Sequence, residues 1–266
     1  MKRISLILLT SALLTFTACY TNPVTGRQSL VLVEPSQELA LGAQSFQQIR
    51  AEQKISTDAA MNARVRKVGE RIAGAVGNQM PNAQWEFVVF DSKDVNAFAL
   101  PGGKVGVYSG LLKLATSDDE LAIVMGHEIG HVIARHGAER MSEQMVIQGI
   151  GTLGAAYAQT KFTPQTVQLA QMAYGGGTTV LGVLPHSRRN ETEADHMGVV
   201  FAANAGYNPE AAIGFWQKMS QQKAGSAGTM EKFLSTHPAD AQRIADLQAL
   251  MPQVMPIYQA NRARFQ

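Results

Sequence analysis

The sequence predicts a mainly α-helical domain that contains one small β-sheet. Apolar residues recur every three or four positions over 61–76, a period that is typical of an amphipathic helix, and other segments begin with helix-start signals. The main β-signal is confined to residues 85–109, where short apolar runs alternate with turn residues. The chain has 266 residues, which is enough to bury a large core, and one cysteine, so no internal disulfide can stabilise it.

Residues 1–19 have the features of a bacterial targeting segment. Two basic residues open the chain, Ile4 to Phe16 is a short apolar run, and small residues precede Cys19. The apolar run is shorter than the ~20 residues that a membrane span needs. The arrangement resembles a lipoprotein signal, in which Cys19 is lipidated, and Tyr20 in place of an aspartate favours the outer membrane. The alternative is an ordinary secretory signal that is cleaved near Ala18.

The remainder, residues 20–266, is expected to form a single domain in the periplasm. The net charge is +2, and the targeting segment contributes its two basic residues, so the sequence has no basic excess that would indicate a nucleic-acid partner. One helix is predicted from Pro35 to about Gln53, and a second, capped by Thr57, ends at Val76. Each helix is expected to pack into the core.

Three strands are predicted next, over residues 85–91, 95–100 and 104–109, with a Pro-Gly-Gly turn between the last two. An edge strand of this sheet would hold an extended peptide by main-chain hydrogen bonds. The candidates for that strand are four consecutive residues, Asn96, Ala97, Phe98 and Ala99. The alternative is that they only pack beneath the following helix.

The stretch from Ser117 to Arg140 predicts that helix. Ser117 and Glu120 have the spacing of a capping box, and two aspartates favour the positive end of the helix dipole. Apolar residues follow, and the helical pattern continues beyond Arg140 to about Ala158. One long helical region is therefore expected here.

This helix contains the pattern H-E-I-G-H. His127 and His131 are four residues apart, so they share one face and can bind a single metal ion. Glu128 lies beside them as a candidate base. The alternative is a pair of partly exposed histidines, but polar groups in so apolar a helix are costly unless something binds them.

A third ligand is predicted on a helix over residues 187–205, which follows a further helix over 163–174 and a glycine-containing connection. Glu191 and Asp195 share one face of it. Glu191 would be the ligand, and Asp195 would accept the free ring N–H of a ligand histidine. Glu193 is expected to face solvent. A charged, solvated face is the alternative interpretation of this helix.

His136 is another candidate for the third ligand. The pattern H-E-x-x-H-x-x-G-x-x-H requires histidine at position 137, where Gly137 stands. The spacing therefore excludes His136 from that class of site.

Together these segments resemble the CAAX prenyl protease family of zinc metallopeptidases, and more closely its soluble bacterial lipoprotein branch. The resemblance covers residues 21 to about 250 and rests on H-E-I-G-H, S-R-R-N-E-T-E-A-D, N-A-F-A-L-P-G-G-K-V-G-V-Y-S-G-L and S-T-H-P. It implies a gluzincin (zincin-like) domain with one zinc ion bound by His127, His131 and Glu191. It also implies that Glu128 is the catalytic base that activates a zinc-bound water. The prenyl proteases themselves have several membrane spans, which this sequence does not show, so prenylated substrates are not implied.

His237 precedes the last predicted helix, residues 238–250. It is predicted either to donate to the oxyanion of the reaction or to occupy the fourth zinc position in a latent enzyme. The alternative is a histidine that only begins a helix.

The function expected is a zinc endopeptidase that cleaves unfolded or misassembled envelope proteins, attached to the membrane through a lipid anchor. The rival is an assembly factor or chaperone that keeps the zinc fold but is latent or weakly proteolytic. An intact Glu128 favours catalysis, because binding alone does not require it. The sequence predicts no oligomeric state.

Overall fold

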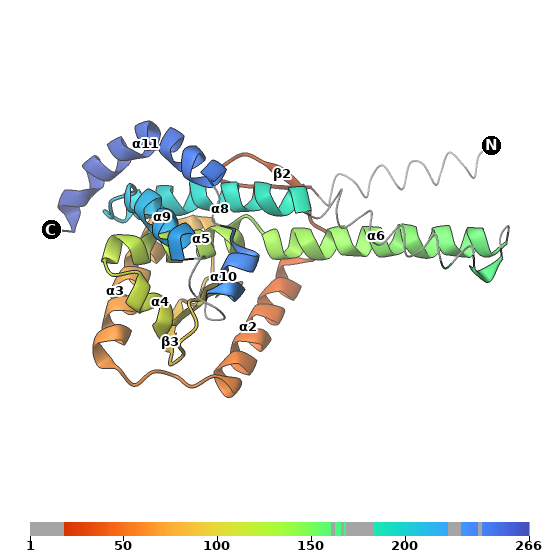
Figure 1. Cartoon of the computed structure of the whole chain (residues 1–266), viewed down its shortest axis with the longest axis horizontal. Coiled ribbons are helices and arrows are strands. Elements are labelled where there is room, and N and C mark those ends of the chain that lie inside the picture. The colour runs from red at the N-terminus through yellow and green to blue at the C-terminus, as the bar shows by residue number, and fades with distance from the viewer. Residues whose placement is uncertain are drawn as a thin grey trace. The chain divides into compact units, whose positions relative to one another are not determined.

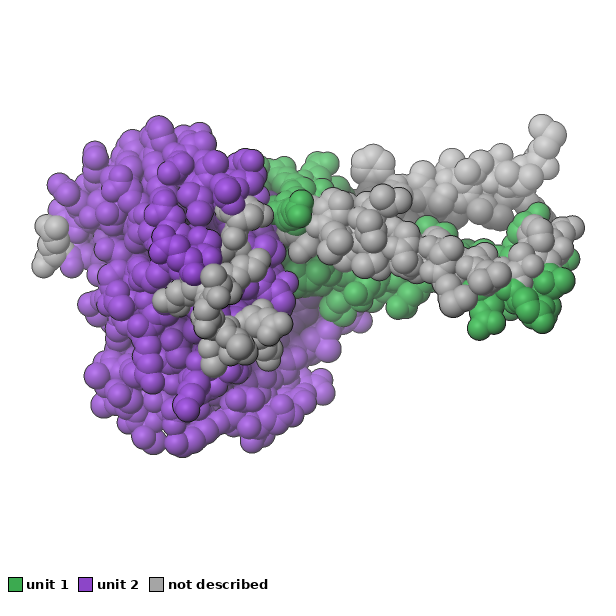
Figure 2. Space-filling model, in the orientation of Figure 1, with its two compact units in different colours: residues 1–35, 135–190 green, residues 36–134, 191–266 purple. Residues whose placement is uncertain are grey.

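The structure, a computed structural model, describes residues 19–160, 163–165, 168, 184–222, 230–238 and 241–265. It is mainly helical with small sheets, which confirms the predicted fold class (Figure 1). The chain divides into two compact units (Figure 2). Unit 1 draws on residues 1–35 and 135–190, and unit 2 on residues 36–134 and 191–266. The single domain expected over 20–266 stays a prediction.

Unit 2 contains most of the described helices. They are α2 (Pro35–Glu52), α3 (Ala59–Val76), η1 (Gly77–Gln79), α4 (Ser109–Leu114), α5 (Asp118–Ile133), α9 (Ala211–Gln222), α10 (Glu231–Thr236), α11 (Ala241–Asn261) and η3 (Arg262–Arg264). Helix α8 (Leu184–Asn204) begins in unit 1 and ends in unit 2. The predicted helices over 35–53, 57–76 and 187–205 are thus confirmed to within a few residues.

Two helix boundaries differ from the predicted ones. Asp58, not Thr57, caps α3, because its side chain accepts a hydrogen bond from the Met61 N–H. Helix α11 does not end near Leu250 but continues through Pro252 and Pro256. Burial of apolar side chains in this second half, such as Val254, offsets the main-chain hydrogen bonds that the prolines cannot donate.

The three predicted strands form one sheet in unit 2. They are β3 (Glu86–Phe90), β4 (Ala97–Leu100) and β5 (Lys104–Tyr108), in the order β3-β5-β4. Strand β5 is parallel to β3 and antiparallel to β4. Phe46 of α2 packs with Phe90 and Tyr108 under the sheet. Within the described residues, β4 is therefore an edge strand, and it packs against α5.

Unit 1 contains a hairpin and a long helix among its described residues. The hairpin pairs β1 (Cys19–Thr21) with β2 (Gln28–Leu30), and the helix is α6 (His136–Gln159). Beyond the hairpin, the Leu32 N–H donates to the Ser142 hydroxyl at 2.8 Å. Val31, Val33 and Ala138 form a small apolar cluster. The hairpin and the first turns of α6 thus pack as one piece.

The prediction of a continuous helix from Ser117 to about Ala158 is wrong. Helix α5 ends at Ile133 and α6 begins at His136. Between them Arg135 has a φ of 56°, a left-handed conformation that is uncommon for a residue other than glycine. Its guanidinium donates to the Val33 carbonyl at 2.8 Å, which helps to fix the chain at the break.

Several predicted segments lie wholly or mostly outside the described residues, namely the helix over 163–174, the connection over 175–185 and the loop over 222–229. In the part of the chain that the structure describes, no helix is long and apolar enough to cross a bilayer.

Candidate metal centre

Helix α5 begins at the predicted capping box. The Glu120 N–H donates to the Ser117 hydroxyl at 3.1 Å, and the Ser117 N–H donates to the Glu120 carboxylate at 3.4 Å. Arg64 of α3 donates to the Asp118 carboxylate at 2.9 Å and to the Ser117 carbonyl at 2.6 Å. The start of the helix is therefore fixed before its apolar residues enter the core.

Small residues let α8 approach α5 closely. A Cβ placed on Gly198 would lie 2.8 Å from the His127 nitrogen, and one on Gly126 would lie 2.9 Å from the Gly198 carbonyl oxygen. A turn away, a Cβ on Gly130 would lie 3.2 Å from the Ala194 carbonyl oxygen. The two backbones are in close contact at this crossing. The side chain of a glutamate on α8 can therefore reach histidines on α5.

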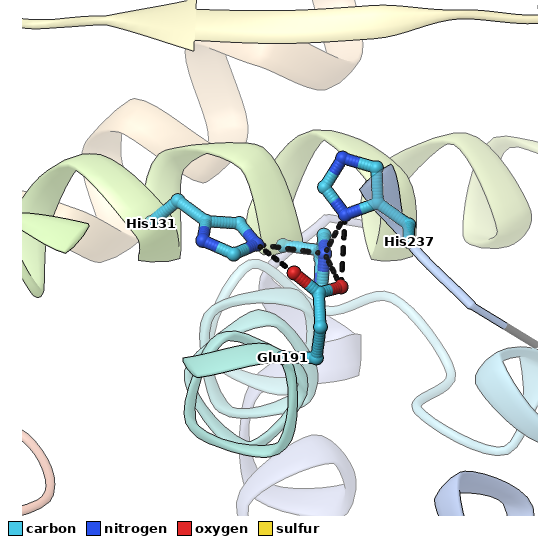
Figure 3. Close-up of side chains that lie close together, drawn as sticks. His131, Glu191 and His237 are labelled. Atoms are coloured by element: carbon cyan, nitrogen blue, oxygen red, sulfur yellow. Dashed lines mark hydrogen bonds and ion pairs between the residues drawn. The ribbon is translucent and has the colours of Figure 1, made fainter. Parts of the chain in front are cut away.

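Four side chains converge beside this crossing. Figure 3 labels three of them, His131, Glu191 and His237. His131 and His127 come from α5, Glu191 from α8, and His237 from the residue that follows α10. One potential ligand atom from each of the four lies within 4.8 Å of all the others. His127 and Glu191 are buried, whereas His131 and His237 are partly buried.

The spacing of these atoms fits a tetrahedral metal ion. With bonds of ~2.1 Å, tetrahedral ligand atoms lie ~3.4 Å apart. The Nε2 atoms of His127 and His131 are 3.1 Å apart, and each lies 3.2–3.4 Å from a Glu191 oxygen. His237 Nδ1 lies 3.1 Å from His127 Nε2 and 2.8 Å from the Glu191 carboxylate. Two or three imidazoles and a carboxylate are a donor set that suits zinc.

Asp195 and Arg243 surround His127 on its other side. His127 Nδ1 lies 3.0 Å from an Asp195 oxygen, which is the contact predicted for Asp195. Arg243 of α11 donates to both Asp195 oxygens, at 2.5 and 2.7 Å. Its guanidinium carbon lies 3.4 Å from the centre of the Trp216 ring. Asp195 is thus held between a histidine and a guanidinium that is stacked on an aromatic ring.

The electrostatics of the group follow from burial and pairing. Burial opposes charge on Glu191, but the surrounding histidines outweigh it and hold the pKa of this carboxyl well below its usual range. Burial likewise disfavours charge on Asp195, and Arg243 and His127 lower its pKa nonetheless. Burial would lower the pKa of His127, whereas the hydrogen bonds with Asp195 and Glu191 raise it to about 9. Both carboxylates therefore remain negative at neutral pH, which is the charge that a metal cation requires.

Glu128 follows the first histidine and is 6% exposed. Its Oε1 has no hydrogen-bond partner among the described residues and lies 3.5 Å from His237 Nε2. Burial raises the pKa of this carboxyl. A buried carboxylate whose pKa is raised is suited to accept a proton.

Other residues singled out from the sequence lie elsewhere. His136 is buried in unit 1, at the start of α6, and is not one of the four converging residues. Glu193 is 6% exposed, so the expectation that it faces solvent is wrong. Residues Asn96 to Ala99 comprise the start of β4 and the residue before it, and Cys19 is exposed in β1.

Sequence reasoning did not identify Trp216 as a neighbour of this group. Nothing in its local pattern distinguishes it from a core residue, since its contacts with Arg243 and His127 depend on where α9 packs.

Comparison with known proteins gives three results. The sequence profile of peptidase family M48 matches residues 59–251. The mitochondrial metalloendopeptidase OMA1 of Schizosaccharomyces pombe is 35% identical over 189 residues, 71% of this chain and 52% of the relative. The β-barrel assembly-enhancing protease of Yersinia pestis is 31% identical over 241 residues, 88% of this chain and 48% of the relative. The chain thus spans about half the length of these two relatives.

Proposed function

Because the chain belongs to peptidase family M48, we propose that it is a zinc-dependent endopeptidase of the bacterial cell envelope that hydrolyses peptide bonds in unfolded or misassembled proteins. The observation that carries this proposal is the position of Glu128 beside the four converging donors. A protein that only bound zinc would need the donors, whereas a buried carboxylate beside them, with one oxygen not hydrogen-bonded to any described residue, serves proton transfer.

The donors His127, His131 and Glu191 would hold one zinc ion. When bound, zinc supplies a Lewis acid for the peptide carbonyl and lowers the pKa of water toward ~7. Glu128 accepts a proton from the attacking water and returns it to the leaving nitrogen. Burial assists Glu128, because it raises the pKa of this carboxyl toward the range in which a group both accepts and releases a proton.

Strand β4 is the proposed binding edge for an extended substrate. The Tyr108 N–H donates to the Asn96 carbonyl at 3.0 Å, and antiparallel pairs alternate between bonded and non-bonded positions. By this alternation Phe98 bonds to β5, whereas the main-chain groups of Ala97 and Ala99 point to the outer edge. A substrate strand added there would form main-chain hydrogen bonds with both alanines and run beside α5.

The proposed location is the periplasm, with Cys19 lipidated and anchored to the outer membrane. Its support is the targeting pattern before Cys19 and the exposed position of that residue in β1. The bacterial relatives named for β-barrel assembly favour a location in the cell envelope. We assign the chain more narrowly to a soluble lipoprotein branch of the prenyl protease family.

His237 favours a second candidate, a latent form of the same enzyme that acts mainly as an assembly factor. Its Nδ1 lies at the fourth corner of the donor group, 2.8 Å from the Glu191 carboxylate. A histidine in that position competes with water for zinc. In the active form His237 would move aside and donate a hydrogen bond to the oxyanion of the reaction.

Zinc content and cleavage of an unfolded reporter protein test both candidates. We expect the wild type and Glu128→Gln to bind one equivalent of zinc, and only the wild type to cleave. Equal cleavage by both proteins would contradict a peptidase that depends on Glu128. Faster cleavage by His237→Ala would support latency, whereas loss of cleavage would support a role for His237 as an oxyanion donor.

A further inference from the structure

Glu139 is a buried carboxylate of unit 1 that the proposed chemistry does not use. It lies in the first turn of α6 and is 2% exposed. Arg27 of the hairpin loop donates to both of its oxygens, at 2.7 and 2.9 Å. Arg189 donates to Oε1 at 3.1 Å, and Asn190 donates to Oε2 at 3.2 Å. One carboxylate thus joins the N-terminal hairpin, the start of α6 and the first half of α8.

The contact with Asn190 bears on the metal centre, because Asn190 immediately precedes Glu191 in the same helix. Successive residues of an α-helix are rotated by ~100° about its axis. A partner that fixes the side chain of Asn190 therefore also fixes the direction in which Glu191 leaves α8. A rotation of this helix by a fraction of that angle would move the Glu191 carboxylate away from the histidines.

Asn190 depends on Glu139 for this contact. It is 1% exposed, and its side-chain oxygen has no hydrogen-bond partner among the described residues. Its amide nitrogen donates to Glu139. Hydrogen bonds to a charged acceptor are stronger than those between neutral groups, so Glu139 restrains Asn190 best as a carboxylate.

Arg27 keeps Glu139 charged and in position. Burial disfavours the charge, but the hydrogen bonds and the charge of Arg27 outweigh burial and lower the pKa of Glu139. The Arg27 pair is bidentate, with both nitrogens on one carboxylate, which sets the orientation of the carboxylate plane. Arg27 therefore orients Glu139, and Glu139 restrains Asn190. Asn190 in turn restrains Glu191, the next residue of α8.

We propose that Glu139 is a positioning residue for Glu191, and that Arg27 couples the N-terminal hairpin to the metal centre through it. The inference goes beyond the proposed function, because it concerns how a ligand is presented and not what is cleaved. It makes the hairpin after Cys19 a determinant of zinc affinity, although none of its residues belongs to the converging group.

The zinc dissociation constant of the full chain, measured by competition with a chromogenic chelator, tests this coupling. Partners that orient a ligand from outside the first layer change metal affinity by ~10- to 100-fold, and we expect ~10-fold weaker binding for both Arg27→Met and Asn190→Ala. The double variant should be weaker by less than the product of the two effects, because both act through Glu139. Arg50→Met is the matched control, since its partner Glu86 lies on β3 and pairs with Arg50 of α2 and Lys104 of β5.

Thermal unfolding of the chelator-treated variants separates positioning from a merely structural role. If Arg27→Met and Asn190→Ala unfold at lower temperature but bind zinc within ~2-fold of the wild type, the inference is overturned. The inference would also be overturned if the double variant weakened zinc binding by the full product of the two single effects. If Arg27→Met does not fold, Arg27→Lys tests the same contact, because it keeps the charge and loses the bidentate geometry. A wild type that binds no zinc would overturn both this inference and the proposed function, whereas unchanged variants would overturn this inference alone.

Discussion

The ion pair between Arg243 and Asp195 is predicted to hold α11 onto α8, and Arg243→Met should destabilise the chain strongly. Both side chains are about 95% buried, with exposures of 4% and 5%, and they form two hydrogen bonds of 2.5 and 2.7 Å. Removing one partner of such a pair leaves a buried charge and costs ~3–5 kcal/mol. Asp195 keeps its contact with His127, so we expect the lower end, ~3 kcal/mol. A domain of this size loses ~2–4 °C in Tm per kcal/mol, which gives a drop of ~6–12 °C.

Circular dichroism of the zinc-free chain measures this drop directly. The control is again Arg50→Met, whose ion pair with Glu86 is about one-third exposed and should contribute at most ~1 kcal/mol. The uncompensated Asp195 charge is the predicted cause, so Asp195→Asn added to Arg243→Met should restore part of the lost stability. The reasoning would be refuted if Arg243→Met cost no more than the control, or if the second substitution destabilised the protein further.

Three further predictions concern the helix crossing, the strand edge and the buried Glu139. Gly198→Ala should cost ~1–3 kcal/mol of stability and weaken zinc binding, because its new methyl group meets the His127 backbone. Gly214→Ala in α9, which meets open space, should instead stabilise by up to ~1 kcal/mol, and equal effects of the two substitutions would contradict the close crossing. Ala99→Pro removes an outward-facing N–H of β4 and should lower kcat/KM on an unfolded substrate by ~10-fold. Ala99→Ser keeps this donor and should not lower it. Equal activities of the two variants would argue against β4 as the substrate-binding edge. The pKa of Glu139 is lower in the folded chain than its ordinary value of ~4.3, so its contribution to stability is present at neutral pH and is lost as the pH falls through that range. Urea titrations at pH 7 and pH 3 should show this loss in the wild type and less of it in Arg27→Met, and equal losses would contradict the pairing.

Local sequence patterns predicted the elements that carry the candidate site. The period of apolar residues located α3, and the capping box marked the start of α5, because these signals depend on neighbours only a few positions away. The helical spacing of His127 with His131 and of Glu191 with Asp195 placed each pair on one face. The convergence of the two faces depends on glycines at the crossing, which let the two backbones approach closely.

The features that sequence reasoning missed depend on contacts between distant segments. Arg135 adopts a left-handed conformation beside a carbonyl of the N-terminal segment, and no local pattern marks an arginine for that geometry. Helix α11 continues past two prolines because its apolar residues are buried by other elements. Glu139 resembles any surface glutamate in the sequence, since its three partners lie about 50 or more than 100 positions away.

The order of the two units along the chain has a consequence for recognising related sequences. Residues 135–190 belong to unit 1 and stand between the two helices that carry the donors, so unit 2 is a domain with an insertion. The entropy cost of closing a loop grows slowly with its length, by ~0.6 kcal/mol for each doubling. We therefore expect the number of residues between H-E-x-x-H and the pair Glu191–Asp195 to vary among relatives. The spacing within each of these two patterns should not vary, because helix geometry sets it. Selection should act on the two ends of the insertion, near Glu139 and Asn190, and relax toward its middle.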